Sequence, residues 1–166
     1  MNTNIDTFID NHKEQMIETL SQLIKIPSVM GEEKADMPFG EYPAEVLEKM
    51  LSKAKENGFI TRNIDNYVGT IDLCEGEPDL GILCHLDVVP EGKGWTYPPF
   101  ELTVKDGKLI GRGTIDDKGP AVATLFALMA VRESGIKLSK KVRMIVGTNE
   151  ENGSADLKYY LKKESM

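Results

Sequence analysis

Long apolar runs are absent from this chain, and cysteine is scarce. No segment approaches the roughly 20 consecutive apolar residues that cross a membrane. The N-terminus, MNTNIDTFIDNHKEQ, lacks the basic and then apolar pattern of a signal peptide. The two cysteines, Cys74 and Cys84, form neither a CxxC pair nor a disulfide framework. These absences predict a cytoplasmic protein that has no membrane partner.

An excess of positive charge is also absent. The 20 Lys and Arg residues are outnumbered by 27 Asp and Glu residues, which gives a net charge of −7. Proteins that bind nucleic acids present a basic face to the phosphates, so we expect no nucleic-acid partner. The acidic balance by itself indicates only solubility, although it also suits a protein that gathers carboxylates around cations.

The hydrophobic periodicity changes along the 166 residues, which are enough for one domain with its own core. Helical spacing alternates with short strand-like runs, and Asp106-Gly107 indicates a hairpin. The predicted helices are 5–25, 41–57 and 120–134, and the predicted strands are 59–64, 67–74, 80–84, 101–104, 108–111 and 141–147. This order predicts an α/β fold with a mixed β-sheet flanked by helices.

The stretch GRGTIDDKGP, residues 111–120, raises the question of a phosphate-binding loop. A dinucleotide loop of the form G-x-G-x-x-G would need a third glycine at position 116, which is an aspartate. A carboxylate there would repel a pyrophosphate, and the chain has no G-x-x-x-x-G-K-[ST] run. The sequence therefore excludes a phosphate cradle at this loop.

Ionisable side chains gather instead where predicted strands end and where the 120–134 helix begins. Without a cation, so many carboxylates at one rim would repel one another, and a divalent metal would make the arrangement favourable. Imidazole and carboxylate ligands suit zinc, and also manganese or cobalt. Taken singly, each group is more often a hydrogen-bonded or turn residue. The group consists of His85, Asp87, Asp116, Asp117, Glu150 and Glu151.

Each residue type suits a task in metal-assisted hydrolysis. His85 offers a ring nitrogen to a metal, and Asp87, two residues on, points to the same side and can hold the other nitrogen. Asp116 offers two oxygens, enough to bridge two ions. Of the adjacent Glu150 and Glu151, one can bind metal while the other takes a proton from water.

The runs HLDVVPEGKGW, WTYPPF, GRGTIDDKGP and GTNEENGS together resemble the co-catalytic zinc peptidases. That family includes carboxypeptidase G, aminoacylases, succinyl-diaminopimelate desuccinylase and the bacterial dipeptidases of the PepV and carnosinase type. The motifs occur in the family's order over nearly the whole chain, and the DDKGP form resembles the PepV type most.

The resemblance implies a role for each matching residue. His85 would bind one zinc, Asp116 would bridge two zincs, and Glu151 would bind the other. Glu150 would be the general base, and Asp87 would steady His85. The substrate would be a small peptide, hydrolysed by an activated water. The peptide bond between Asp116 and Asp117 would be cis.

The resemblance also implies that residues 1–166 are the N-terminal segment of the catalytic domain, without the lid domain. Further ligands would lie beyond Glu151, so we expect an inactive fragment, whose exposed apolar sheet edge favours self-association. The alternatives are an acyl-amino-acid deacylase of the same family, a magnesium- or manganese-dependent phosphoesterase, and a non-catalytic remnant that binds metal.

Overall fold

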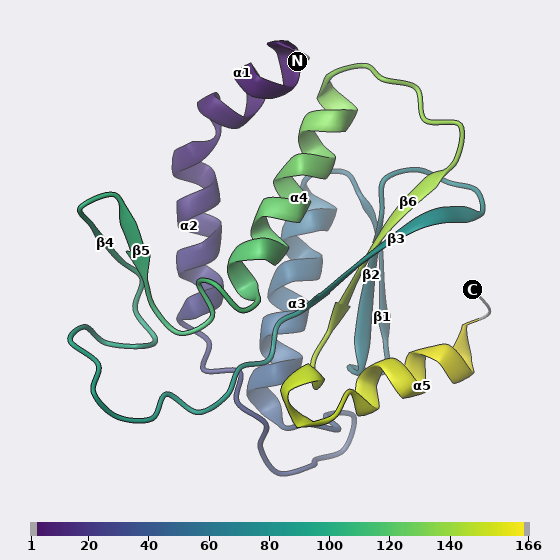
Figure 1. Ribbon diagram of the computed structural model, residues 1–166. Coiled ribbons are helices and arrows are strands. Elements are labelled where there is room, and N and C mark those ends of the chain that lie inside the picture. Colours follow the sequence, from purple (N-terminus) through teal and green to yellow (C-terminus); the bar gives the residue numbers. More distant parts are fainter. Residues whose placement is uncertain (1–2, 165–166) are drawn as a thin grey trace.

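A four-stranded mixed sheet forms the centre of the computed structural model, which describes residues 3–164 (Figure 1). The strand order is β1 (Ile60–Ile64), β2 (Val68–Asp72), β6 (Lys141–Gly147) and β3 (Pro78–His85). The β1–β2 and β2–β6 pairs are antiparallel, whereas β3 and β6 are parallel. Parallel strands need a long crossover, and α4 (Lys118–Glu133) lies between β3 and β6 in the chain. The predicted mixed sheet is confirmed.

The helices cover the sheet unequally. Helices α3 (Glu41–Glu56) and α4 pack against one face, α2 (Lys13–Ile24) packs on α4, and the short α5 (Ala155–Lys163) lies against the other face (Figure 1). None of the helices within residues 3–164 combines the length and apolar character needed to cross a membrane. The remaining elements are α1 (Thr3–Asn11), the hairpin strands β4 (Thr103–Lys105) and β5 (Lys108–Ile110), and a 3-10 turn, η1 (Glu150–Asn152).

The first helix differs from the prediction. The expected single helix over 5–25 is two helices that meet at His12, where φ is −109° and ψ is 9°. The His12 ring stacks on Phe8 at 3.8 Å between ring centroids, and its Nδ1 lies 2.7 Å from the Phe8 carbonyl oxygen. This local side-chain bond competes with the regular helical pattern, and the apolar periodicity did not reveal it.

Alternation along β6 divides the core into two clusters. Met144 and Val146 face α3 and α4 in the larger cluster, whereas Ile145 faces α5 in a smaller cluster with Tyr160. Successive strand residues point to opposite faces, so one strand supplies both clusters. Gly69 on β2 allows α3 to approach closely, because a β-carbon there would lie within 3.0 Å of three side chains.

The outer edge of β3 has no partner strand among the described residues. Leu80 and Leu83 on this strand are 54% and 56% exposed. An exposed edge with apolar side chains is a recognised site of strand pairing between chains. The self-association expected from the sequence stays a prediction, now assigned to β3.

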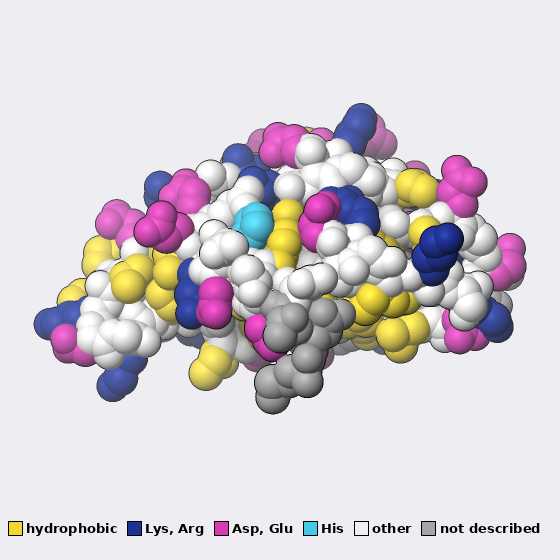
Figure 2. Space-filling view, turned by 90° about the horizontal axis from the view of Figure 1, so that it is seen from above, with side chains coloured by type: hydrophobic (Ala, Val, Ile, Leu, Met, Phe, Trp, Pro, Cys, Tyr) yellow, Lys and Arg dark blue, Asp and Glu magenta, His cyan; other side chains and the backbone are white. Residues whose placement is uncertain are grey.

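Charges of both signs are mixed on the surface. On the face that Figure 2 shows, acidic and basic side chains lie side by side, without a continuous basic stripe. Exposed pairs such as Lys34–Glu41, at 2.7 Å, hold lysines next to acids.

Candidate metal centre

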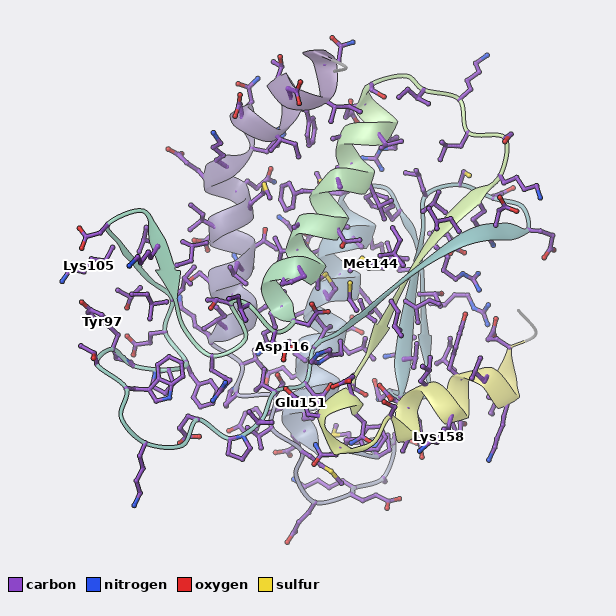
Figure 3. All side chains as sticks on the ribbon, in the orientation of Figure 1. Tyr97, Lys105, Asp116, Met144, Glu151 and Lys158 are labelled. Atoms are coloured by element: carbon purple, nitrogen blue, oxygen red, sulfur yellow. The ribbon has the colours of Figure 1, made fainter. Side chains whose placement is uncertain are left out.

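Three segments meet at the carboxyl ends of β3 and β6. The two strands are parallel and in register at their ends, where His85 lies opposite Gly147. The turn η1 carries Glu150 and Glu151 shortly after β6, and Asp116 lies just before α4. Ligand sites in open α/β sheets occur at this edge. Figure 3 shows the labelled Asp116 and Glu151 near each other between the start of α4 and the turn before α5.

The side chains of His85, Asp116 and Glu151 form a group whose ligand atoms all lie within 4.8 Å of one another. His85 Nε2 is 3.0 Å from Asp116 Oδ1, and 3.9 Å from Glu150 Oε2. The imidazole is only 11% exposed, whereas Asp116 and Glu150 are 68% and 56% exposed. A buried nitrogen faced by accessible carboxylates can receive an ion from solvent.

The donor set fits a divalent metal. One imidazole and several carboxylates are the ligands that zinc, manganese and cobalt accept. Burial raises the pKa of the Glu151 carboxyl, and repulsion from the charge of Asp116 raises it further. A bound cation would relieve this repulsion.

Hydrogen bonding selects which His85 nitrogen is free. Nδ1 lies 3.1 Å from the backbone carbonyl oxygen of Asp87, an acceptor, so Nδ1 carries the proton. Nε2 is then the nitrogen that faces Asp116 and can bind metal once it is deprotonated. Burial lowers the pKa of His85, but the hydrogen bond and charge of Asp87, together with Asp116, raise it overall to about 9.

Asp87 is fully buried and contacts more of the site than the sequence indicated. Its Oδ1 lies 3.4 Å from His85 Nδ1, so the imidazole is held by both the carbonyl and the carboxylate of one residue. The same carboxylate accepts hydrogen bonds from the backbone N–H groups of Glu150 and Glu151, each at 3.1 Å. The sequence had no signal for these two bonds, because they depend on the β3–β6 pairing.

The two adjacent aspartates point to different partners. Asp117 Oδ2 accepts a hydrogen bond from the backbone N–H of His85 at 3.0 Å, while Asp116 faces the His85 ring. The Asp116–Asp117 peptide bond is cis, as the resemblance implies. Burial raises the pKa of the Asp117 carboxyl. Asp117 occupies the N-cap position of α4 but its side chain makes no capping bond.

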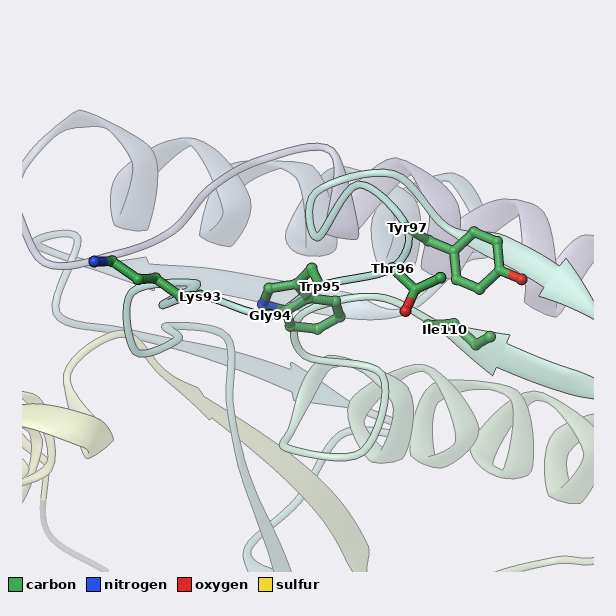
Figure 4. A pocket seen from close by; sticks show the side chains of 6 residues that line it. All are labelled: Lys93, Gly94, Trp95, Thr96, Tyr97 and Ile110. Carbon is green, nitrogen blue, oxygen red and sulfur yellow. The ribbon is translucent and has the colours of Figure 1, made fainter.

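Two cavities lie near these segments. One, of about 230 Å³, is lined by His85, Asp117 and Glu150 together with apolar groups of β3 and α5. The other, of about 310 Å³, is lined by Trp95, Tyr97 and Ile110 among other residues, and contains none of the six predicted site residues (Figure 4). Trp95 therefore lines a pocket.

Comparison with known proteins agrees with this chemistry. The model of "Peptidase family M20/M25/M40" matches residues 81–165, which include every side chain of the candidate site.

Curated relatives carry dipeptidase names. The chain is 42% identical over 156 residues to the putative dipeptidase YtjP of Bacillus subtilis, covering 93% of this chain and 34% of that protein. It is 38% identical over 167 residues to the Beta-Ala-Xaa dipeptidase of Lactobacillus delbrueckii subsp. lactis, covering 99% of this chain and 36% of that protein. The chain thus spans about a third of the length of the curated relatives it matches.

Solved structures share the fold. Human carnosine dipeptidase 1 superposes with a TM-score of 0.84 at 25% identity, over 99% of this chain and 38% of that one. The di-peptidase Dug1p from Saccharomyces cerevisiae superposes with a TM-score of 0.72 at 25% identity, over the same shares.

Proposed function

Because the chain belongs to peptidase family M20/M25/M40, we propose that it carries the metal-binding part of a zinc-dependent dipeptidase site. The observation that carries the proposal is the convergence of His85, Asp116 and Glu151 within 4.8 Å, from three separate segments. Residues 1–166 are proposed to be the first part of the catalytic domain, since they span about a third of the relatives' length.

The proposed roles follow from the contacts. His85 Nε2 and Asp116 would hold one zinc, and Asp116 and Glu151 would hold the other. Bound zinc would polarise the scissile carbonyl and make water more acidic. Glu150, exposed and 3.9 Å from His85 Nε2, would accept the proton of the attacking water and return it to the leaving amine. Manganese or cobalt suits the same donors.

The proposed substrate is a dipeptide, supported by the dipeptidase names of the relatives and of the solved structures. Deacylation of an acyl-amino acid breaks the same type of amide bond and is the second candidate. The proposed compartment is the cytoplasm, where the free thiols of Cys74 and Cys84 would stay reduced.

Metal binding is tested on the 166-residue chain itself. We expect the purified parent to retain zinc after desalting and Asp116→Ala to lose it, whereas Glu101→Ala, which removes an exposed carboxylate outside the site, keeps it. At a zinc concentration about 100 times the Kd, binding adds about 2.7 kcal/mol, and the Tm rises by about 5–11 °C. Equal zinc retention by Asp116→Ala and the parent would exclude this site.

Turnover is a separate measurement. In a longer form of the protein that supplies the further ligands, release of amino acids from dipeptides with zinc or manganese should be lost in Glu150→Gln, which keeps the shape of the side chain but cannot take a proton. Full activity in this variant would refute the assignment of the base. Zinc binding without turnover of any dipeptide or acyl-amino acid would favour a non-catalytic metal-binding segment, and turnover of a phosphate ester alone would overturn the peptidase proposal.

A further inference from the structure

Lys118, the first residue of α4, has an amino group on a side chain with no exposed surface. A buried ammonium is costly unless its protons are bonded. Its Nζ donates to the backbone carbonyl oxygens of Leu23, at 2.9 Å, and Ile26, at 2.7 Å. The Leu23 carbonyl lies in the last turn of α2 and the Ile26 carbonyl just after it, where acceptors lack helical partners. Lys118 thus connects the start of α4 to the end of α2.

The glycines of GRGTIDDKGP make room for this connection. A β-carbon at Gly113 would lie 3.1 Å from Lys118 Cδ and 3.2 Å from a methyl group of Val88. A β-carbon at Gly111 would lie 3.3 Å from Ile24, the last residue of α2. The Gly-x-Gly pattern therefore has a packing reason: the loop passes close to the lysine stem and the end of α2.

The segment that follows α2 is in turn bonded to the segment that carries Asp87. The Ser28 hydroxyl donates to the carbonyl oxygen of Leu86 at 2.6 Å, and the Val88 N–H donates to the carbonyl oxygen of Ser28 at 3.1 Å. These bonds fix the residues on both sides of Asp87. Asp87 then holds His85 and the N–H groups of the two glutamates, so a continuous set of contacts runs from the lysine to the metal group.

We propose that Lys118 is a positioning residue for the metal centre, which holds the loop with Asp116 and the segment with Asp87 at a fixed separation through the end of α2. The lysine touches neither metal nor substrate in this role. The inference rests on the proposed metal site, and it goes beyond it by assigning the site's geometry to a contact with the N-terminal helices.

The test compares Lys118→Met, which removes charge and donors, with Lys118→Arg, which keeps both. Val46→Ala in α3 is the control for lost stability, because its side chain is fully buried in the core and makes none of the network's hydrogen bonds. Zinc affinity is measured by competition with a chelator at a temperature where all variants are folded. Changes in groups that orient metal ligands typically weaken affinity about 10–100-fold. We expect a loss of that size in Lys118→Met, partial recovery in Lys118→Arg, and parental affinity in Val46→Ala.

A metal-free readout separates this inference from the proposed function. Amide hydrogen exchange of Glu150 and Glu151, whose N–H groups are held by Asp87, should accelerate in Lys118→Met relative to Val46→Ala. If the parent binds no zinc, the proposed function fails while exchange still tests the positioning role. If Lys118→Met does not fold, Gly111→Ala, whose β-carbon would press on Ile24 at the end of α2, should weaken zinc binding similarly. Parental zinc affinity and parental exchange in a folded variant would overturn the inference.

Discussion

Replacing Asp87 by Asn tests how one buried carboxylate organises the centre. The aspartate accepts from the N–H groups of Glu150 and Glu151 at 3.1 Å, and its Oδ1 lies 3.4 Å from His85 Nδ1. An asparagine keeps one acceptor oxygen and turns an NH₂ group towards the other N–H. One hydrogen bond to a charged group is lost, which costs about 1.5–3 kcal/mol. For a chain of this length the Tm should fall by about 3–12 °C.

The same substitution should change the protonation of His85. Burial lowers the pKa of this imidazole, and Asp87 is the main contribution that raises it to about 9. Removing the negative charge should move the pKa down towards the ordinary value of about 6.5. The folded-state pKa is raised, so the associated stability is present below the unfolded pKa and is lost as pH rises through about 9. Asp87→Asn should lack this loss.

Nuclear magnetic resonance titration of the His85 ring checks the shift, with His12→Gln to assign the two histidines. Asp156→Asn is the matched control, since Asp156 is 2% exposed and its Oδ2 accepts from Thr148 N–H at 2.7 Å and Asn149 N–H at 2.9 Å without contacting His85. Both variants should lose stability, but only Asp87→Asn should lower the pKa of His85. A pKa that stays near 9 in Asp87→Asn would refute the reasoning.

Three further predictions concern the rest of the fold. Burial raises the pKa of Asp72, but the hydrogen bonds and charge of Arg143 lower it overall, so Asp72→Asn should cost about 3–5 kcal/mol at neutral pH. That deficit should shrink in urea unfolding measurements as the pH falls below about 4, because Asp72 is protonated first in the unfolded parent and in the folded parent only at lower pH. A deficit that stays constant would contradict the ion pair. Gly119→Ala should lose about 3 kcal/mol, since its β-carbon would clash with the backbone carbonyl oxygen of Thr114, and unchanged urea unfolding would contradict this packing. Leu83→Lys should abolish concentration-dependent association in sedimentation experiments; association that persists would place the interface elsewhere than β3.

The sequence predicted the sheet class well because most strands end at glycine, proline or charged residues. The helix break at His12 was missed, since a ring stacking on Phe8 leaves the apolar spacing unchanged. The order of strands in the sheet was not predicted either, because pairing between β3 and β6 depends on contacts distant in sequence.

The sequence revealed only part of the candidate site, because contacts between residues distant in sequence position the rest. His85, Asp116 and Glu151 are chemically conspicuous at predicted strand ends, and motif spacing linked them. The second function of Asp87 depends on two backbone N–H groups from another strand, which no side-chain pattern reveals. Lys118 resembled an ordinary surface lysine beside the aspartates until its burial and its bonds to α2 were known.

The pairing of His85 with Gly147 fixes the distance between His85 and the two glutamates that follow β6. Each residue along a strand advances about 3.3 Å and reverses the side to which a side chain points. A slip of β6 by one residue would therefore carry both glutamates about 3.3 Å along the strand direction and disrupt the bonds to Asp87. A change in the length of the connection 134–140, before β6, would leave the pairing of His85 with Gly147 unchanged. The pairing of β3 with β6 therefore sets the geometry of the candidate metal site, whereas the length of the loop before β6 does not.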